Sequence, residues 1–404
     1  MNNSDNTLPL HEVQNLGYSI EQFRDLGIFP QTINEFRDRI PQMVAGKFLV
    51  NGKTYLQGRY IQVKRNSILI MDLLDFIKIY HSSQGTAITG LSLVRDHFRI
   101  YQGELIGSDK LLFWSFGCGI GDLLFISTIL NFIKDKNPKS KITWALPREY
   151  HSFVRSFNIV DDVISTPFDS KYLVTSKFHL HFDTLINHFR KGKVGNCYEL
   201  MNEFANTNIP KEDLRPEILV MPQAQKFINK MNLGKYIVLH LNTSSPMRNP
   251  NMKFKLSILD KLLMQYNDNL KVLFVDSADK KKDIDLLIDS CIDPNKCINL
   301  AGKTRSMMEV AAVLKNAKCV VSVDTSIIHI ATAVGTPIYG IYGPFSGEQR
   351  LSTYNNCKWV NGTCPISPCR LHQQEPCPQS VDAFSPCYNS INLDNCIEEI
   401  KTLI

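Results

Sequence analysis

From about residue 110 to the C-terminus, short apolar runs alternate with longer segments in which apolar residues recur every three to four positions. The short runs predict buried strands, and the longer segments predict helices. In the first half, the pattern predicts strands at 111–116, 141–146, 161–165 and 183–188 and a helix at 122–134. In the second half, it predicts strands at 236–241, 272–276, 319–323 and 337–342, and helices at 255–266, 283–289, 306–317 and 326–334. This alternation is typical of parallel α/β domains.

The first hundred residues follow a different pattern. Residues 1–40 have helical spacing, whereas residues 46–101 contain short alternating stretches separated by Asn51-Gly52 and Gly58, which predicts hairpins. A polar, Pro-containing stretch at 210–225 is the candidate linker between the two α/β parts. We therefore expect an accessory α+β module at 1–108, an α/β domain at 109–220 and a second at 221–404, which includes a Cys-rich loop at 357–387.

Composition and charge narrow the class of protein. The chain is 44% hydrophobic and 21% charged, as ordinary soluble proteins are, and the 404 residues suffice for two to three domains. Two apolar stretches, 111–133 and 319–343, have the length of a membrane span, but each contains glycines and one Asp, which favours a buried strand, loop and helix. The N-terminus has no apolar run, so we expect no secretory signal and a cytoplasmic protein.

The net charge of +6 is mild, and part of it is concentrated near the front. No acidic residue lies between Pro41 and Met71, a segment with five basic side chains: Lys47, Lys53, Arg59, Lys64 and Arg65. This segment is either a surface for an anionic partner or the solvated face of a small β module.

A glycine-rich loop precedes the first predicted helix of the α/β part. Gly117, Gly119 and Gly121 allow the backbone to approach a bound group closely, and Asp122 follows at the start of the helix. The helix dipole there favours an ionised carboxylate, which can act as a general base or can simply cap the helix. No acidic residue follows at the usual distance for a ribose contact, so an NAD site is not expected.

A second loop follows the strand at 319–323. Asp324, Thr325 and Ser326 end this strand and open a helix, and His329 comes one turn later. Backbone N–H groups and hydroxyls at a helix start can bind phosphate oxygens. The alternative is that Thr325 and Ser326 cap the helix while His329 is a satisfied core residue.

Six of the eleven cysteines lie between Cys357 and Cys396. Four of them surround prolines in one loop and form a candidate tetrahedral site for a structural iron or zinc: Cys364, Cys369, Cys377 and Cys387. Cys357 or Cys396 can replace one ligand of the four. The alternative is a set of free thiols, or a disulfide under oxidation.

The segment Val320–Pro344 strongly resembles the C-terminal signature of family 9 glycosyltransferases, the heptosyltransferase family. Gly121-Asp122 and the helix after it resemble the start of the same family, so the resemblance extends from about residue 110 to the C-terminus. It implies a GT-B fold, in which two Rossmann-like domains face one cleft, with 109–220 as the acceptor domain and 221–404 as the donor domain. Family members are inverting enzymes that need no metal for the transfer.

The resemblance also implies roles for single residues. Asp122 would be the base that deprotonates the acceptor. The donor phosphates would be bound by Asp324, Thr325, Ser326 and His329, together with Asn242, Thr243 and Arg248 from the loop after the strand at 236–241. Asp276 or Asp279 would contact the nucleoside. The cysteine-rich tail is similar to an iron-binding finger of the autotransporter heptosyltransferases.

We therefore expect a glycosyltransferase that moves a sugar, plausibly heptose from ADP-heptose, to a hydroxyl group of a protein or glycan acceptor. A transferase acting on modified DNA bases is a more remote alternative, since DNA-binding motifs are missing. A non-catalytic nucleotide-sugar-binding protein and a nucleotide-sugar epimerase of similar design are two further candidates. A homo-oligomer is left open.

Overall fold

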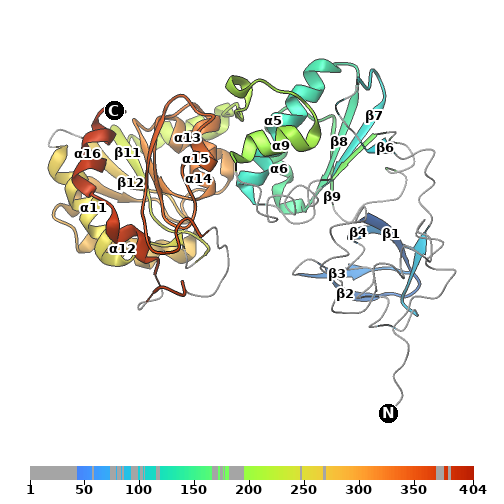
Figure 1. Ribbon diagram of the computed structural model, residues 1–404, viewed down its shortest axis with the longest axis horizontal. Helices are drawn as coiled ribbons and strands as arrows, with labels where there is room; N and C mark the ends of the chain where they lie inside the picture. Colours follow the sequence, from blue (N-terminus) through green and yellow to red (C-terminus); the bar gives the residue numbers. More distant parts are fainter. Residues whose placement is uncertain are drawn as a thin grey trace, which may run out of the picture. The chain divides into compact units, whose positions relative to one another are not determined.

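The computed structural model describes residues 43–404, apart from 57–58, 73–78, 80–82, 84–85, 92–98, 101–102, 104, 115–118, 166–171, 173–175, 177, 182–194, 246–247, 267–269, 370–376 and 381–383. The chain separates into two compact units (Figure 1). The first contains residues 1–117, 134–151 and 160–188, and the second contains 118–133, 152–159 and 189–404. The helices expected within residues 1–40 and the strand expected at 183–188 lie outside the described residues, and the three-part division of the chain stays a prediction.

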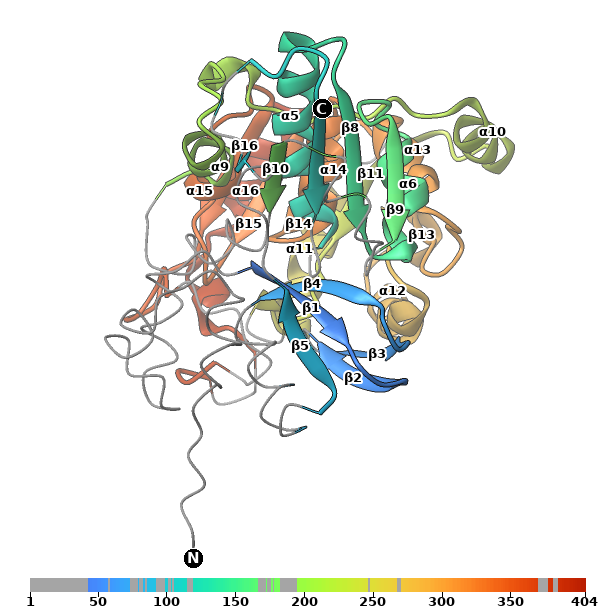
Figure 2. The same ribbon diagram turned by 90° about the vertical axis from the view of Figure 1, so that its right-hand side faces the viewer.

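The first unit contains a parallel sheet with the strand order β6-β10-β7-β8-β9 (Figure 2). Its strands are β6 (Arg99–Ile100), β7 (Lys110–Trp114), β8 (Lys141–Leu146), β9 (Asp162–Ser165) and β10 (Phe178–His181). The expected strands at 111–116, 141–146 and 161–165 correspond to β7, β8 and β9. The rings of Phe113 and Trp144 pack edge to face at 5.4 Å on neighbouring strands, which fixes one core contact of this sheet.

The front of the first unit is made of antiparallel strands. β1 (Met43–Phe48) pairs with both β4 (Ile68–Asp72) and β5 (Ile88–Leu91), and β2 (Gly52–Leu56) pairs with β3 (Arg59–Val63). The expectation of successive hairpins is therefore only half right, because β2 and β3 form one while β1 skips them to pair with β4. Phe48 of β1 and Ile88 of β5 are partners in the pairing of β1 with β5, and both side chains are buried.

The second unit contains a six-stranded parallel sheet in the order β13-β12-β11-β14-β15-β16. Its strands are β11 (Lys235–His240), β12 (Leu270–Phe274), β13 (Cys297–Asn299), β14 (Val320–Val323), β15 (Ile338–Tyr342) and β16 (Cys357–Asn361). Most of these strands are apolar on both faces, as a parallel sheet covered on both sides requires. The sequence predicted four of them and missed the short β13 and the half-buried β16.

Helices cover this second sheet on both faces. α11 (Met252–Gln265), α12 (Lys281–Asp289) and α16 (Leu393–Lys401) pack on one core cluster together with Leu239, Val272 and Val321 of the strands. α13 (Met307–Lys315) and α14 (Ser326–Ala333) carry further buried faces, and the Tyr236 hydroxyl donates to the Val313 carbonyl at 2.7 Å. Asn251, Ser306 and Thr325 cap α11, α13 and α14 with their side chains.

Three further helices belong to the second unit in whole or in part. α5 (Ile120–Lys136) begins in this unit and ends in the first, and the second unit also contains α9 (Cys197–Ala205) and α10 (Pro222–Met231). The expectation of a linker over 210–225 is wrong at its end, because Pro222 opens α10 and proline is well suited to the first helical position. Among the described residues, no helix is long and apolar enough to cross a membrane.

Candidate functional site

The order of the six-stranded sheet reverses between β11 and β14. From β11 the chain runs outward through β12 and β13, whereas β14, β15 and β16 extend the other way. In open α/β sheets, ligands bind beyond the carboxyl ends of the strands at such a reversal. Two segments leave the sheet at this point: the loop 241–251 after β11 and the segment 324–326 between β14 and α14.

Asp324 lies at the centre of this edge, between two arginines. Arg350 donates from Nε to Asp324 Oδ1 at 3.1 Å, and Arg248 Nη1 lies 3.6 Å from Asp324 Oδ2. The same Arg248 Nη1 also donates to the backbone carbonyl of Asp324 at 2.8 Å. Only 6% of the Asp324 side chain is exposed, so this carboxylate balances charge within the site and leaves the two guanidinium groups with a net positive charge.

The charge state of Asp324 follows from these contacts. Burial raises the pKa of this carboxyl group, but the positive charges of Arg350 and Arg248 outweigh burial and hold its pKa below the ordinary value. Two buried polar atoms of the cluster, Asp324 Oδ2 and Arg248 Nε, have no hydrogen-bond partner among the residues that the structure describes. A buried donor without a partner is costly unless a ligand satisfies it, so Arg248 Nε marks a place for an acceptor such as a phosphate oxygen.

The start of α14 provides the uncharged donors of the site. The Thr325 hydroxyl accepts from the Ile327 N–H at 3.3 Å and lies 3.3 Å from the Ser322 hydroxyl, so this side chain caps the helix. Ser326 is half-exposed and makes no such cap. Of these two hydroxyls, Ser326 is therefore the one available to a ligand, and the backbone N–H groups of the first turn add to it.

The loop after β11 is held by its own side chains. Thr243 is buried, its hydroxyl donates to the Ser245 carbonyl at 2.6 Å, and its N–H donates to Asn249 Oδ1 at 2.7 Å. Thr243 therefore shapes the loop, whereas Arg248 reaches Asp324 across the reversal of the sheet. Tyr388 also fixes the loop, since its hydroxyl donates to the Arg248 carbonyl at 2.7 Å.

His329 is buried among aromatic rings. Its ring lies edge to face with Phe125 at 4.8 Å, and its Nδ1 lies 3.5 Å from the Tyr354 hydroxyl. Burial, followed by the nearby charge of Arg350, lowers the pKa of His329 to about 4, while the charge of Asp324 acts in the opposite direction. The ring is therefore neutral at physiological pH, and as a phosphate ligand it would lack the charge of an imidazolium.

The ring of His329 also touches the start of α5. A Cβ atom added at Gly121 would lie 2.9 Å from His329 Cδ2, which is closer than such contacts allow. A glycine is thus required at this position for a steric reason, and the contact brings the residue before Asp122 against α14. Gly119 lies within the same turn, whereas Gly117 falls outside the described residues.

Asp122 lies in the first turn of α5, where its Oδ2 accepts a hydrogen bond from the Gly119 N–H at 2.7 Å. Its negative charge, like that of Asp324, raises the pKa of the buried Cys197 thiol, after burial as the main cause and against the charge of Arg350. Asp122 and the arginine cluster therefore act on the same buried group. The hydrogen bond from Gly119 is the helix-capping contact that the sequence offers as one of two roles for Asp122.

Sequence reasoning missed a second layer of the site. Arg350, on α15 (Glu348–Leu351), donates from Nη1 to Cys197 Sγ at 2.5 Å and stacks 4.7 Å from the centre of the Phe345 ring. Tyr198 joins the layer through a 2.5 Å hydrogen bond with the Tyr354 hydroxyl. The sequence contains no local signal for these contacts, because the partners lie on α9 and in the segment after α15, more than 150 positions apart.

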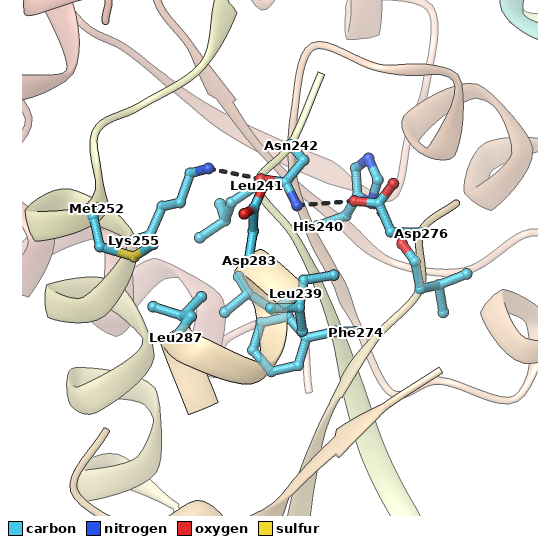
Figure 3. Close-up of a pocket in the computed structure, with 12 residues that line it drawn as sticks. Leu239, His240, Leu241, Asn242, Met252, Lys255, Phe274, Asp276, Asp283 and Leu287 are labelled. Atoms are coloured by element: carbon cyan, nitrogen blue, oxygen red, sulfur yellow. Dashed lines mark hydrogen bonds and ion pairs between the residues drawn. The ribbon is translucent and has the colours of Figure 1, made fainter. Parts of the chain in front are cut away.

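The two candidate nucleoside contacts differ in their surroundings, and Figure 3 shows those of Asp276. Asp276 accepts from Asn242 Nδ2 at 2.9 Å and from the Ser277 N–H at 2.8 Å, and 11% of its side chain is exposed. Asp279 is exposed, and a hydrogen bond from Ser277 is the main cause that holds its pKa low. Asp279 is therefore open to a ligand, whereas Asp276 is already used within the protein.

The cysteine loop brings two of its four thiols together. Cys364 and Cys387 form a side-chain hydrogen bond, and burial raises the pKa of Cys387 to about 11. Among the residues that the structure describes, no three His, Cys, Asp or Glu side chains lie close enough together to hold a metal ion. Within this described part of the chain, Cys369 and Cys377 do not join the other two thiols in one group, so the expected four-thiolate site stays a prediction.

Comparisons with known proteins agree with the geometry of the donor side. The model of the family "Glycosyltransferase family 9 (heptosyltransferase)" matches residues 178–379, which is half of the chain. The chain belongs to glycosyltransferase family 9. It is therefore a transferase. Over 52 residues it is also 44% identical to lipooligosaccharide heptosyltransferase 2 of Haemophilus influenzae, but this match spans only 13% of the chain and 15% of that protein.

Solved structures of this family share the fold. ADP-heptose lps heptosyltransferase II of E. coli has a TM-score of 0.57 at 14% identity, covering 73% of this chain and 98% of that one. A family 9 glycosyltransferase of Veillonella parvula gives 0.56 at 13% identity, covering 75% and 99%. The iron-containing dodecameric glycosyltransferase TibC of enterotoxigenic E. coli gives 0.52 at 12% identity, covering 90% and 92%. The fold of this glycosyltransferase is accordingly of the GT-B type.

Proposed function

We propose that this family 9 glycosyltransferase is an inverting enzyme that moves a heptose from ADP-heptose to a hydroxyl group of a protein or glycan acceptor. The observation that supports this most is the buried cluster of Arg248, Asp324 and Arg350 at the reversal of the six-stranded sheet. Two cations beside a helix start suit the negative charge of a nucleoside diphosphate, and this supports the proposal.

The chemistry assigned to the site is a single displacement. Asp122 takes the proton from the acceptor hydroxyl as its oxygen forms a bond to the anomeric carbon of the sugar. The bond between that carbon and the phosphate oxygen breaks in the same step, and ADP leaves with the electron pair. Arg248, together with the N–H groups at the start of α14, stabilises the negative charge that develops on the leaving phosphate. Displacement from the opposite side inverts the configuration at carbon 1.

The nature of the donor is supported by what the neighbours bind. TibC has been solved in complex with ADP-D-β-D-heptose, with a TM-score of 0.52 to this chain, and an E. coli heptosyltransferase has been solved with ADP. The identities are 11% and 16%, so these structures support a donor class without determining it for this protein. A screen of ADP- and UDP-sugars, with mass detection of nucleotide release, tests the proposal. Release of UDP alone would refute ADP-heptose as the donor.

A macromolecular acceptor is the version that we favour. TibC covers 90% of this chain, whereas E. coli heptosyltransferase II covers 73%. The additional coverage includes part of the chain that precedes the family 9 core, and such a part is a natural place for contacts with a large acceptor. Transfer to purified protein acceptors and to lipopolysaccharide core, compared side by side, separates the two acceptor classes.

A structural iron or zinc on Cys364, Cys369, Cys377 and Cys387 stays a prediction. The iron of TibC supports this prediction. The structure does not add to this support, because only two of the four thiols lie together among the described residues. We assign no step of the transfer to a metal. Metal analysis of the purified protein, with less than about one tenth of an equivalent of iron and zinc as the refuting result, decides the matter. The expected cytoplasmic location and a homo-oligomer, as in dodecameric TibC, likewise remain proposals.

A further inference from the structure

A lysine on α11 holds the first residue of the donor-side loop. Lys255 Nζ donates to Asn242 Oδ1 at 2.6 Å, and Asn242 Nδ2 in turn donates to Asp276 Oδ2 at 2.9 Å (Figure 3). The hydrogen-bond network continues through Asp276, whose Oδ1 accepts a hydrogen bond from the Ser277 N–H at 2.8 Å. One amide thus ties together the loop after β11, the segment after β12 and helix α11.

The ammonium group of Lys255 reaches Asn242 along the wall of a small, mostly apolar pocket. Leu239, Phe274 and Leu287 form part of its lining, and its volume of about 20 Å³ has room for about one water molecule. Burial in these surroundings lowers the pKa of Lys255 to about 8, although the charges of Asp283 and Asp276 act in the opposite direction. The lysine therefore loses its charge within a range of pH that the protein can experience.

The charged groups that face Lys255 come from several elements. Asp283 is on α12, Asp276 follows β12, and Lys280 lies on the short helix Ala278–Lys280, where it opposes the charge of Lys255. His240, at the end of β11, lines the same pocket, and its Nδ1–H donates to the Val275 carbonyl at 2.7 Å. Lys255 is the group among these that donates a hydrogen bond to Asn242 Oδ1.

We propose that Lys255 is a positioning residue for the donor site, and that its positive charge holds Asn242, and through it the loop that contains Arg248, in the arrangement that binds the diphosphate. This inference rests on the proposed function. Asn242 is the residue directly before Thr243, whose hydroxyl donates to the Ser245 carbonyl, and the Arg248 N–H donates to the same carbonyl at 3.0 Å. Loss of the lysine charge weakens the hydrogen bond to Asn242 Oδ1 and with it the hold on the loop, so that nucleotide affinity falls as the pH rises through about 8.

Titration calorimetry with ADP between pH 7 and pH 9 tests this. We expect the Kd of wild-type protein to rise roughly tenfold over this range, as it would on losing one charge-assisted hydrogen bond. Lys255→Met should show the weak affinity at every pH, whereas Lys255→Arg, which keeps its charge, should lose most of the dependence on pH. Lys253→Met is the matched control, since Lys253 is exposed on the same helix, and it should behave as wild type.

A second measurement separates failure of this inference from failure of the proposed function. Hydrogen exchange of residues 242–251 in the absence of nucleotide should be faster in Lys255→Met than in wild type, with no change on α13. If wild type does not bind ADP at any pH, the donor proposal is wrong, while the exchange result still decides about Lys255. Equal hydrogen exchange of residues 242–251 in wild type and Lys255→Met overturns the inference. The same pH dependence of the Kd for ADP in these two proteins also overturns it. If Lys255→Met does not fold, the comparison of wild type with Lys255→Arg decides.

Discussion

Arg350 and Asp324 form a buried ion pair, with Arg350 Nε 3.1 Å from Asp324 Oδ1. The two residues lie 26 positions apart in the sequence. Arg350 is on α15, and Asp324 directly follows β14. Burial disfavours the charge on Arg350, but Asp324 outweighs it and raises the pKa of the guanidinium group. The pair therefore stays fully ionised, and each partner depends on the other.

The first prediction concerns this pair. Arg350→Met leaves Asp324 buried with Arg248 alone, and the loss of one partner of a buried pair costs about 3 kcal/mol of unfolding free energy. Adding Asp324→Asn removes the unpaired charge, so the double variant should be less destabilised than the sum of the two single variants. Denaturant unfolding of the four proteins measures this. Additive costs would show that the two groups do not interact.

The second prediction separates capping from ligand binding at the start of α14. Thr325→Ala removes the cap on the Ile327 N–H and should lower the free energy of unfolding by about 1 kcal/mol. Ser326→Ala removes a half-exposed hydroxyl, so it should leave stability within about 0.5 kcal/mol and weaken ADP binding instead. Thermal unfolding and ADP titration on both variants distinguish the two roles. The reverse pattern would exchange the assignments.

The third prediction concerns the contact between Gly121 and His329. A methyl group at position 121 would lie 2.9 Å from His329 Cδ2, so Gly121→Ala must shift the start of α5 and with it Asp122. We expect a loss of kcat of at least about tenfold, since small displacements of a catalytic group are costly. Gly119→Ala is the control, because its added Cβ would meet Asp122 Oδ2 at an ordinary 3.6 Å. Equal losses in both variants would contradict the steric argument.

The fourth prediction concerns pH. The pKa of His329 is lowered to about 4, below its value in the unfolded chain, so the unfolded state binds more protons between the two values. The stability that comes from keeping His329 neutral is present above pH 6.5 and is lost as the pH falls toward 4, by about 3 kcal/mol in all. Asp324, whose pKa is also lowered, adds a loss at still more acid pH. Unfolding measured from pH 7 to pH 4 should show this slope in wild type and a flatter one in His329→Gln.

The donor side of the fold could be predicted from the sequence because its signals are local. Buried strands such as β14 are short apolar runs, and Thr325 marks the start of α14 as a cap. The sequence could not predict the pairing of β1 with β4, which skips over the β2–β3 hairpin. It also could not predict α10, because the polar segment that contains Pro222 has the composition of a linker. The order of strands along the chain does not determine which strands are neighbours in a sheet.

For the candidate site, too, the sequence could indicate only the residues that have a local signal. Asp122, Asp324 and Arg248 could be named because each stands in, or directly after, a loop that follows a strand. Arg350, Cys197 and the two tyrosines that join hydroxyls could not be named, since their contacts are made only by folding. The structure also separates residues that the sequence grouped together: Thr243 shapes its loop, and Asp276 is used within the protein, whereas Asp279 is exposed.

The assignment of Asp122 as the base is the central claim, and one measurement tests it most directly. Single-turnover transfer from ADP-heptose should fall at least about a thousandfold in Asp122→Asn while the Kd for ADP stays within about twofold of wild type. Asp135→Asn, an exposed carboxylate on the same helix α5, is the control and should transfer at the wild-type rate. Unchanged transfer by Asp122→Asn, with ADP still bound, would contradict the account.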